Sequence, residues 1–195
     1  MRFRRILLGA ALLFATVNVA TVDTADATTI ASLTTEQMTD ASTYIVEGTV
    51  ERVWVEEDED GRIWTRAKLL VDTVYKGPDT PSEIIIDAMG GHSWTTVSAI
   101  EGQARFSKDE KVLVFLDVIR HGTRLTPVAQ FYGKYTIRRA PGEDRHHVMR
   151  TPTRPNSLFD ARFLPHPAPE ARVYLDDVRS SISTRLETGW DGQSI

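Results

Sequence analysis

The stretch that most constrains the fold runs from Thr43 to Gly77 and contains two long segments in which apolar and polar residues alternate. Alternation with a period of two is typical of a β-strand that has one buried face. The segments are separated by Asp60-Gly61, a dipeptide that tolerates the positive φ angles of a tight hairpin turn. The sequence therefore predicts a long β-hairpin, which we expect to be the first hairpin of a small β-barrel.

The expected register of this hairpin follows from a two-residue turn. Such a turn places Trp54 opposite Ala67 on the inner face, and it places Trp64 on the outer face opposite Glu57. Gly48 lies on the inner face, where it lets the strand coil sharply. The expected core face consists of Val46, Val50, Trp54, Ala67, Leu69, Val71 and Tyr75. The expected solvent face carries Glu47, Thr49, Glu51, Glu57, Arg66, Lys68 and Asp72.

Residues 1–27 have the pattern of a signal peptide, with a basic start, an apolar run over 6–22 and the small-x-small sequence Ala25-Asp26-Ala27. We expect cleavage before Thr28 and an exported protein, periplasmic or extracellular. An uncleaved anchor is the alternative, but the run is short for a bilayer span. General secretion is favoured over twin-arginine export, because only the arginine pair of that motif is present.

Composition narrows the class of protein further. The chain of 195 residues has no cysteine, which excludes disulfides, thiolate zinc sites, cysteine nucleophiles and a lipoprotein anchor. An exported protein without disulfides needs a core of its own, and this is typical of bacterial exported proteins. A chain of this size can bury about 70% of its unfolded surface. The net charge of −4 argues against nucleic acid as a main partner.

Helices are expected on both sides of a β-rich middle. The N-terminal segment 28–42 contains a short helix over 31–41, where Thr34 and Gln37 have the spacing of a capping box. A C-terminal amphipathic helix is expected over 169–187, opened by Pro169. Its apolar stripe is Ala171, Leu175, Val178, Ile182 and Leu186. The Pro-rich segment 151–168 is expected to wrap the domain, and 188–195 to form a flexible tail.

Between these helices, the sequence predicts a barrel over residues 43–150. The strand over 83–87 contains three consecutive isoleucines, so we expect it to be buried on both faces. Residues 88–103 form a long irregular connection, and such loops are often functional. Further strands are expected at 111–119, 124–129 and 133–139, with short ones within 95–100 and 146–150. This order predicts a mainly β fold, a five- or six-stranded antiparallel barrel of the OB type.

Several short motifs point to a known family. They are Ile45-Val46-Glu47-Gly48-Thr49-Val50, Val71-x-x-Val74-Tyr75-Lys76-Gly77, Gly90-Gly91, Phe106-x-x-x-Glu110 followed by an apolar strand, and Gly133-Lys134-Tyr135. Over about residues 40–140 the chain resembles uncharacterised exported bacterial proteins with a netrin-like domain, the OB-type fold of the tissue inhibitors of metalloproteases. The resemblance implies the barrel and an inhibitor-like role. Those inhibitors chelate zinc through an N-terminal cysteine, so that mode of inhibition transfers to no residue of this cysteine-free chain.

The turn of the first hairpin raises the question of a metal site. Glu56, Asp58 and Asp60 match the first positions of a calcium-binding loop. The closing acid of such a loop would fall at Ala67, and the flanking segments are strands instead of helices. A solvated acidic hairpin tip is therefore favoured over calcium binding. We expect no cofactor.

Two further motifs invite catalytic or metal-binding interpretations. Ser93 follows His92, but Thr95 occupies the glycine position that a hydrolase nucleophile turn requires. A structural loop is favoured, and we predict no catalytic residue. His146 and His147 are adjacent and point to opposite faces of a strand, so exposed polar histidines are favoured over a metal site there and at His121 and His166.

The aromatic residues suggest where a partner would bind. Trp64 on the outer face, together with His92 and Trp94 in the 88–103 loop, forms the expected binding surface. Tyr132 and Tyr135 are further candidates for a binding platform. Four arginines are interpreted as a solvated strand edge, namely Arg138, Arg139, Arg145 and Arg150.

These observations leave three functions open. A secreted, non-enzymatic binding module with a protein partner is favoured, because the chain has an export signal, a stable fold and no reaction chemistry. The alternative is a metalloprotease-inhibitor-like protein that uses a surface without cysteine, with a secreted protease as its partner. A hydrolase that uses the 90–95 loop comes third. No nucleic acid and no stable membrane anchor are expected.

Overall fold

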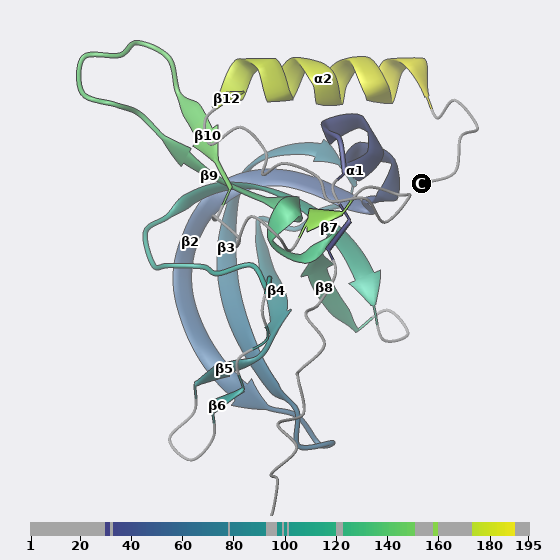
Figure 1. Cartoon of the computed structure of the whole chain (residues 1–195), viewed down its shortest axis with the longest axis vertical. Coiled ribbons are helices and arrows are strands. Elements are labelled where there is room, and N and C mark those ends of the chain that lie inside the picture. Colours follow the sequence, from purple (N-terminus) through teal and green to yellow (C-terminus); the bar gives the residue numbers. More distant parts are fainter. Residues whose placement is uncertain are drawn as a thin grey trace, which may run out of the picture.

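A computed structural model describes residues 30–31, 33–77, 79–92, 97–98, 100, 102–119, 123–150, 158–159 and 173–189. The fold is mainly β, with a large sheet built around one long curved hairpin and two helices packed above one end of it (Figure 1). Within these residues, neither α-helix has the length and apolar character needed to cross a bilayer. The expected signal peptide lies outside the described residues, as does most of the expected Pro-rich wrap and C-terminal tail.

The expected strands occur with small shifts in their ends. The strands are β1 (Ile30–Ala31), β2 (Tyr44–Glu57), β3 (Ile63–Lys76), β4 (Glu83–Met89), β5 (Gly91–His92), β6 (Val97–Ser98), β7 (Lys111–Ile119), β8 (Arg124–Pro127), β9 (Lys134–Arg138), β10 (His147–Met149), β11 (Leu158–Phe159) and β12 (Val173–Tyr174). The helices are α1 (Thr35–Ala41), a single 3-10 turn η1 (Gln130–Gly133) and α2 (Leu175–Thr188).

Both expected helices form, but each begins later than predicted. The capping box that opens α1 is confirmed, since Thr34 accepts a hydrogen bond from the Gln37 amide and Gln37 accepts one from the Thr34 amide. α2 begins at Leu175 instead of Pro169, because Val173–Tyr174 pairs with β10 as a strand. Pro169 lies outside the described residues.

The large sheet has the strand order β12-β10-β9-β7-β2-β3-β4-β8. β8 also pairs antiparallel with β7 over Leu116–Ile119, and it meets β4 at a single parallel bridge between Ile86 and Leu125. The pairings of β7, β2, β3, β4 and β8 therefore run in a circuit, with one weak link between β4 and β8. β9, β10 and β12 continue the sheet outward from β7 and carry the chain to α2.

The hairpin register differs by one residue from the prediction near the turn, where Trp54 pairs with Arg66 instead of Ala67. The connection runs through residues 58–62, and the Asp58 side chain organises it. Asp58 Oδ1 accepts hydrogen bonds from the amides of Asp60 and Arg62, at 3.0 and 2.9 Å. A local side chain of this kind stabilises a longer turn, so the two-residue turn was the wrong assumption.

Three register shifts along β2 and β3 bend the hairpin and change which residues face inward. One shift follows Glu47, where a side chain at Gly48 would overlap the carbonyl oxygen of Leu70. The glycine is therefore required by the close approach of β3, in line with the predicted coiling. Of the expected core face, Val46, Val50, Ala67 and Leu69 are fully buried, Val71 and Tyr75 are half-buried, and Trp54 is not part of the core.

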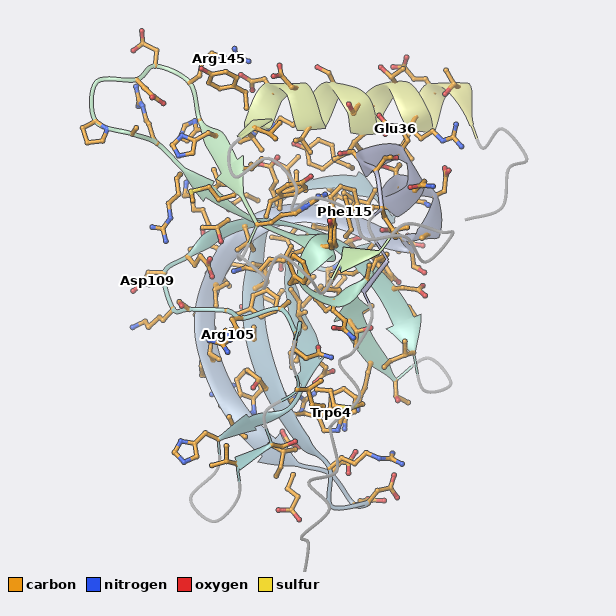
Figure 2. All side chains as sticks on the ribbon, viewed as in Figure 1. Glu36, Trp64, Arg105, Asp109, Phe115 and Arg145 are labelled. Atoms are coloured by element: carbon orange, nitrogen blue, oxygen red, sulfur yellow. The ribbon has the colours of Figure 1, made fainter. Side chains whose placement is uncertain are left out.

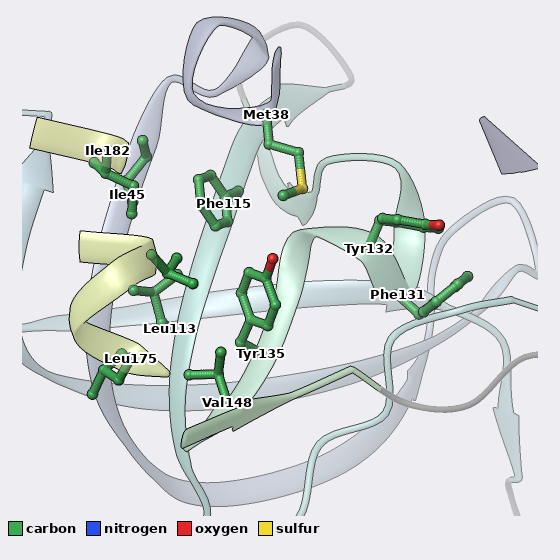
Figure 3. Close-up of a cluster of buried hydrophobic side chains, with 11 residues drawn as sticks. Met38, Ile45, Leu113, Phe115, Phe131, Tyr132, Tyr135, Val148, Leu175 and Ile182 are labelled. Atoms are coloured by element: carbon green, nitrogen blue, oxygen red, sulfur yellow. The ribbon is translucent and has the colours of Figure 1, made fainter. Parts of the chain in front are cut away.

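Two hydrophobic clusters share the central strands. Successive residues of β7 alternate between them, since Leu113 and Phe115 face the helices while Val112, Val114 and Leu116 face the opposite side. Burial on both faces explains why this strand is almost continuously apolar. Figure 3 shows the cluster under the helices, where Leu175 and Ile182 of α2 face Ile45 and Leu113.

Ile85 and Leu186 were expected to be buried but are exposed. Ile85 is 39% exposed, because it points away from the face on which β4 buries Ile84, Ile86 and Ala88. Leu186 is also exposed at the end of α2, although Leu175, Val178 and Ile182 of the same predicted stripe are buried. Alternation along a strand with a single covered face accounts for Ile85.

Ion pairs fix α2 to the rest of the fold. Arg179 donates Nε and Nη2 to the two carboxylate oxygens of Glu47, at 2.8 and 2.7 Å. Arg185 binds Asp40 of α1 in the same bidentate way. Glu47 was predicted to face solvent but is buried, because α2 covers its face of the hairpin. It also accepts a hydrogen bond from the Tyr75 hydroxyl at 2.6 Å.

Candidate binding pocket

A cavity opens where β4 ends. It has a volume of about 690 Å³ and is lined by Thr65 and by residues 88–92, 97–98, 100 and 103–106. We call it the β4–β6 pocket. It lies at the end of the molecule that carries the β5–β6 ribbon, away from the two helices (Figure 1). The pocket includes much of the long connection for which the sequence predicted a functional role.

Two glycines shape the wall of the pocket. Gly90 has a φ of 93°, and its amide donates to the Ile63 carbonyl at 2.8 Å while its carbonyl accepts from the Thr65 hydroxyl. A Cβ on Gly90 would lie 2.6 Å from the Ser98 carbonyl oxygen. Gly91, with a φ of 150°, begins β5 and lies close to Thr65. The glycine pair therefore lets β4 turn away from β3 and form the short ribbon with β6.

Segment 103–106 lines the pocket, and we call it the pocket floor. A buried lysine, Lys134, holds this segment in place. Lys134 is 3% exposed, and its ammonium donates to the Arg105 carbonyl at 2.6 Å and to Glu110 at 2.7 Å. Burial lowers the pKa of Lys134, while its contact with Glu110 acts in the opposite direction. The Lys134 ammonium also lies 5.2 Å from the centre of the Phe106 ring. Because Ala104 and Phe106 belong to the hydrophobic cluster that contains Val112 and Val114, segment 103–106 is held between this ion pair and that cluster.

The mouth of the pocket combines exposed apolar side chains with cationic or polar ones. Met89 is 38% exposed and Val97 is 68% exposed. The Arg105 side chain is exposed and makes no ion pair with any described residue, and the His92 imidazole is also exposed. Figure 2 places Arg105 in the half of the molecule that holds the ribbon. None of the described residues that line the pocket is acidic, and Arg105 is cationic, so this part of the rim favours a ligand with a negative group.

Of the two predicted binding residues that the structure describes, His92 and Trp64, only His92 lines this pocket. Trp64 was predicted to be exposed, but it is 1% exposed. Its indole nitrogen donates to Asp58 Oδ2 at 2.9 Å, and the Arg124 guanidinium stacks 4.3 Å from its ring centre. Trp94 lies outside the described residues, as does Ser93. Of the His92–Ser93 pair considered for a hydrolase, the structure therefore describes His92 alone.

The hairpin places both tryptophans on the same face, since Trp54 pairs with Arg66 and Trp64 pairs with Glu56. Trp54, predicted to be in the core, is partly exposed on this face, with the guanidinium groups of Arg52 and Arg66 at 4.3 and 5.6 Å from its ring centre. The register shift between Val50 and Arg52 turns Trp54 away from the core face on which Val50 lies. Trp64 lies on the outer face, as predicted, but Asp58 and Arg124 cover it there.

The three candidate calcium ligands of the hairpin tip, Glu56, Asp58 and Asp60, each have a partner in the hairpin. Glu56 binds Arg66 at 2.8 Å, which holds the pKa of Glu56 below its usual range. Asp60 binds Arg62 at 2.9 Å, while Asp58 accepts from two backbone amides and from Trp64. No group of acidic or histidine side chains that could hold a metal is present among the described residues. These three acidic side chains are therefore bound by neighbouring groups of the hairpin.

Other predicted surface residues are buried. Tyr132 and Tyr135 belong to the core under the helices and are not the exposed platform that was predicted. His147 is buried within 3.6 Å of Glu143, whereas His146 is exposed, as expected for adjacent residues of a strand. His121 and His166 lie outside the described residues. Arg150 is half-buried, unlike the exposed Arg138.

Sequence reasoning missed the polar residues that depend on distant partners. Asp87 is buried between Arg66 and Arg124, at 3.0 and 3.1 Å, and burial raises its pKa although both arginines act to lower it. Lys134 and Arg105 were missed because the pocket floor and the strand behind it are far apart in sequence. The only local signal was the unusual position of Asp87 beside three isoleucines.

Comparison with known proteins identifies no family for this chain. No family model matches the chain, and no curated protein matches its sequence.

Proposed function

We propose that this chain is an exported, non-enzymatic binding module, and that the β4–β6 pocket holds an extended segment of a partner protein. The observation that carries this proposal is the composition of the pocket mouth. Exposed Met89 and Val97 stand beside an apolar cavity, with Arg105 and His92 at the rim. Protein ligand sites are mostly apolar, with a few polar groups that orient the ligand.

The chemistry of the pocket specifies the kind of segment that fits. An apolar side chain would fill the cavity and cover Met89 and Val97, which removes apolar surface from water. A carboxylate next to it would pair with the unpaired Arg105 guanidinium. The partner segment is therefore an extended stretch with an apolar residue beside an acidic one.

The proposal includes a more specific fold, in which the large sheet forms an OB-type barrel. An OB-type barrel has five strands and is partly open. The circuit of β7, β2, β3, β4 and β8, with its single bridge between β4 and β8, supports this assignment. So do the netrin-like motifs in the first hairpin and around β7. Loops at the ends of such a barrel are common binding sites, and the β4–β6 pocket occupies such a position.

A binding experiment tests the pocket. The immobilised full chain would be exposed to the exported proteins of its source organism, and the affinity of each retained protein would be measured for variants. Val97→Asp and Arg105→Glu should each weaken binding at least tenfold, because one adds a charge to the apolar mouth and the other reverses the rim charge. Val74→Asp is the matched control, since Val74 is 41% exposed and lies outside the pocket lining. Equal loss in all three variants, or no retained protein at micromolar concentration, would refute the proposal.

Metalloprotease inhibition is a second candidate function, supported by the resemblance and by the five-strand circuit. Its test is a titration of secreted metalloproteases with the protein, following residual activity. Stoichiometric loss of activity that Val97→Asp abolishes would identify the partner as a protease. Full protease activity at micromolar excess of the protein would refute inhibition of the proteases tested. The proposal of a binding module would then stand alone. Hydrolysis through the 90–95 loop remains third, and loss of an ester-cleaving activity in His92→Ala would support it.

A further inference from the structure

A second site is indicated by Arg150, an arginine that forms no ion pair with a described acidic residue. Arg150 follows β10, and its guanidinium carbon lies 4.4 Å from the ring centres of both Tyr132 and Tyr135. Nη2 donates to the Tyr135 hydroxyl and lies 3.7 Å from Met38 Sδ. The cation is thus enclosed by α1, η1 and β9, on the helix side of the sheet.

The polar atoms around this guanidinium are incompletely satisfied. Arg150 Nε is buried without a hydrogen-bond partner, and so is the hydroxyl of Tyr132, a residue that is 1% exposed. No carboxylate of the described residues forms an ion pair with Arg150. Buried polar groups are usually paired, and those that are not deserve an explanation. Burial lowers the pKa of Arg150, which expresses the cost of holding an uncompensated cation there.

Two other arginines of the chain show how a guanidinium in this fold binds a carboxylate. Arg179 and Arg185 each direct Nε and Nη2 at the two oxygens of one carboxylate, from Glu47 and Asp40. Arg150 has only a tyrosine hydroxyl on the same edge. A planar guanidinium matches a carboxylate in this geometry better than it matches any neutral acceptor.

We infer that Arg150, Tyr132 and Tyr135 form a receptor for a single carboxylate group. The carboxylate would accept from the guanidinium and from the free Tyr132 hydroxyl, while the tyrosine rings shield the pair from water. The group could be a small free carboxylate or an acidic side chain of a partner. This site is separate from the β4–β6 pocket and does not depend on its proposed function.

The test follows the Arg150 side chain by nuclear magnetic resonance. The Nε–H resonance of Arg150 in the full chain, assigned by its loss in Arg150→Lys, would be recorded during titration with sodium acetate. N-acetyl-glutamate amide in a parallel titration represents an acidic side chain. We expect a saturable shift with at least one probe, and the tighter of the two identifies the source of the carboxylate. No saturable shift with either probe, or the same shift with sodium chloride at equal ionic strength, would overturn the inference.

A variant gives an independent measure that needs no resonance assignment. Arg150→Gln removes the cation and keeps a polar side chain, and it should weaken acetate affinity at least tenfold as followed by tyrosine absorbance. Arg138→Gln is the matched control, because Arg138 is an exposed arginine on the neighbouring strand β9. Val97→Asp should leave acetate binding unchanged, and a loss there would show that the two sites are not separate. If Arg150→Gln does not fold, the wild-type titration still decides the question.

Discussion

Replacement of Lys134 by methionine should destabilise the protein and loosen the pocket floor. The Lys134 ammonium donates to the Arg105 carbonyl, to Glu110 and, at 3.2 Å, to Thr136. The Glu110 side chain is nearly as buried as that of Lys134, at 9% and 3% exposure. Lys134→Met therefore leaves a buried carboxylate without its cation.

The size of the effect follows from this burial. Removing one partner of a buried ion pair costs about 3–5 kcal/mol, because the other charge stays buried. Glu110 retains the Ser107 amide and the Thr136 hydroxyl, so the lower part of this range, about 3 kcal/mol, is expected. For a protein of this size, that corresponds to a decrease in Tm of roughly 6–12 °C.

Urea unfolding, followed by the fluorescence of the buried Trp64, measures this loss. Lys111→Met is the matched control, because Lys111 is an exposed lysine on β7, and it should cost less than about 0.5 kcal/mol. Glu110→Gln on the Lys134→Met background should recover about 1 kcal/mol or more, since it neutralises the stranded charge. Hydrogen exchange should quicken at residues 103–106. A loss below about 1 kcal/mol for Lys134→Met, similar to that of Lys111→Met, would refute the reasoning.

Three further predictions follow from the hairpin. Burial, together with the Glu47 carboxylate, raises the pKa of Tyr75 to about 12. The neutral Tyr75 hydroxyl therefore stabilises the fold below pH 10, and this stabilisation is lost as the pH rises to 12. Urea unfolding at pH 9 and 11 should show a lower free energy of unfolding at pH 11 in the wild type, and Tyr75→Phe should lack this decrease. Gly48→Ala should cost at least 2 kcal/mol by overpacking against the facing strand, and an unchanged Tm would contradict the described bulge. Asp58→Ala should cost about 2 kcal/mol, because it frees two turn amides and the Trp64 indole; a red-shifted Trp64 emission at low urea would accompany it, and unchanged emission would argue against this contact.

Much of the fold could be predicted from short-range patterns. The alternating segments of the first hairpin, the apolar run of β7 and the capping box of α1 are local signals, because they depend on backbone geometry and on residues within one turn or one strand. The importance of the connection after β4 was also visible, since a long loop with paired glycines needs a structural reason. His92, which was predicted to bind a partner, lines the pocket, although nothing in its sequence neighbourhood indicated that Arg105 lines the same pocket.

Other features depended on contacts between segments distant in the chain. The partial exposure of Trp54 follows from the register of the hairpin, whereas Trp64 is buried because Asp58 and Arg124 cover the outer face on which it lies. Glu47 and Lys134 resemble ordinary surface residues until α2 and segment 103–106 cover them. Arg150 was interpreted as a solvated edge residue because its sequence neighbours are polar, whereas α1, η1 and β9 enclose it. Local sequence specifies which segments become strands and helices, but the burial and pairing of a charged side chain depend on what the folded chain brings against it.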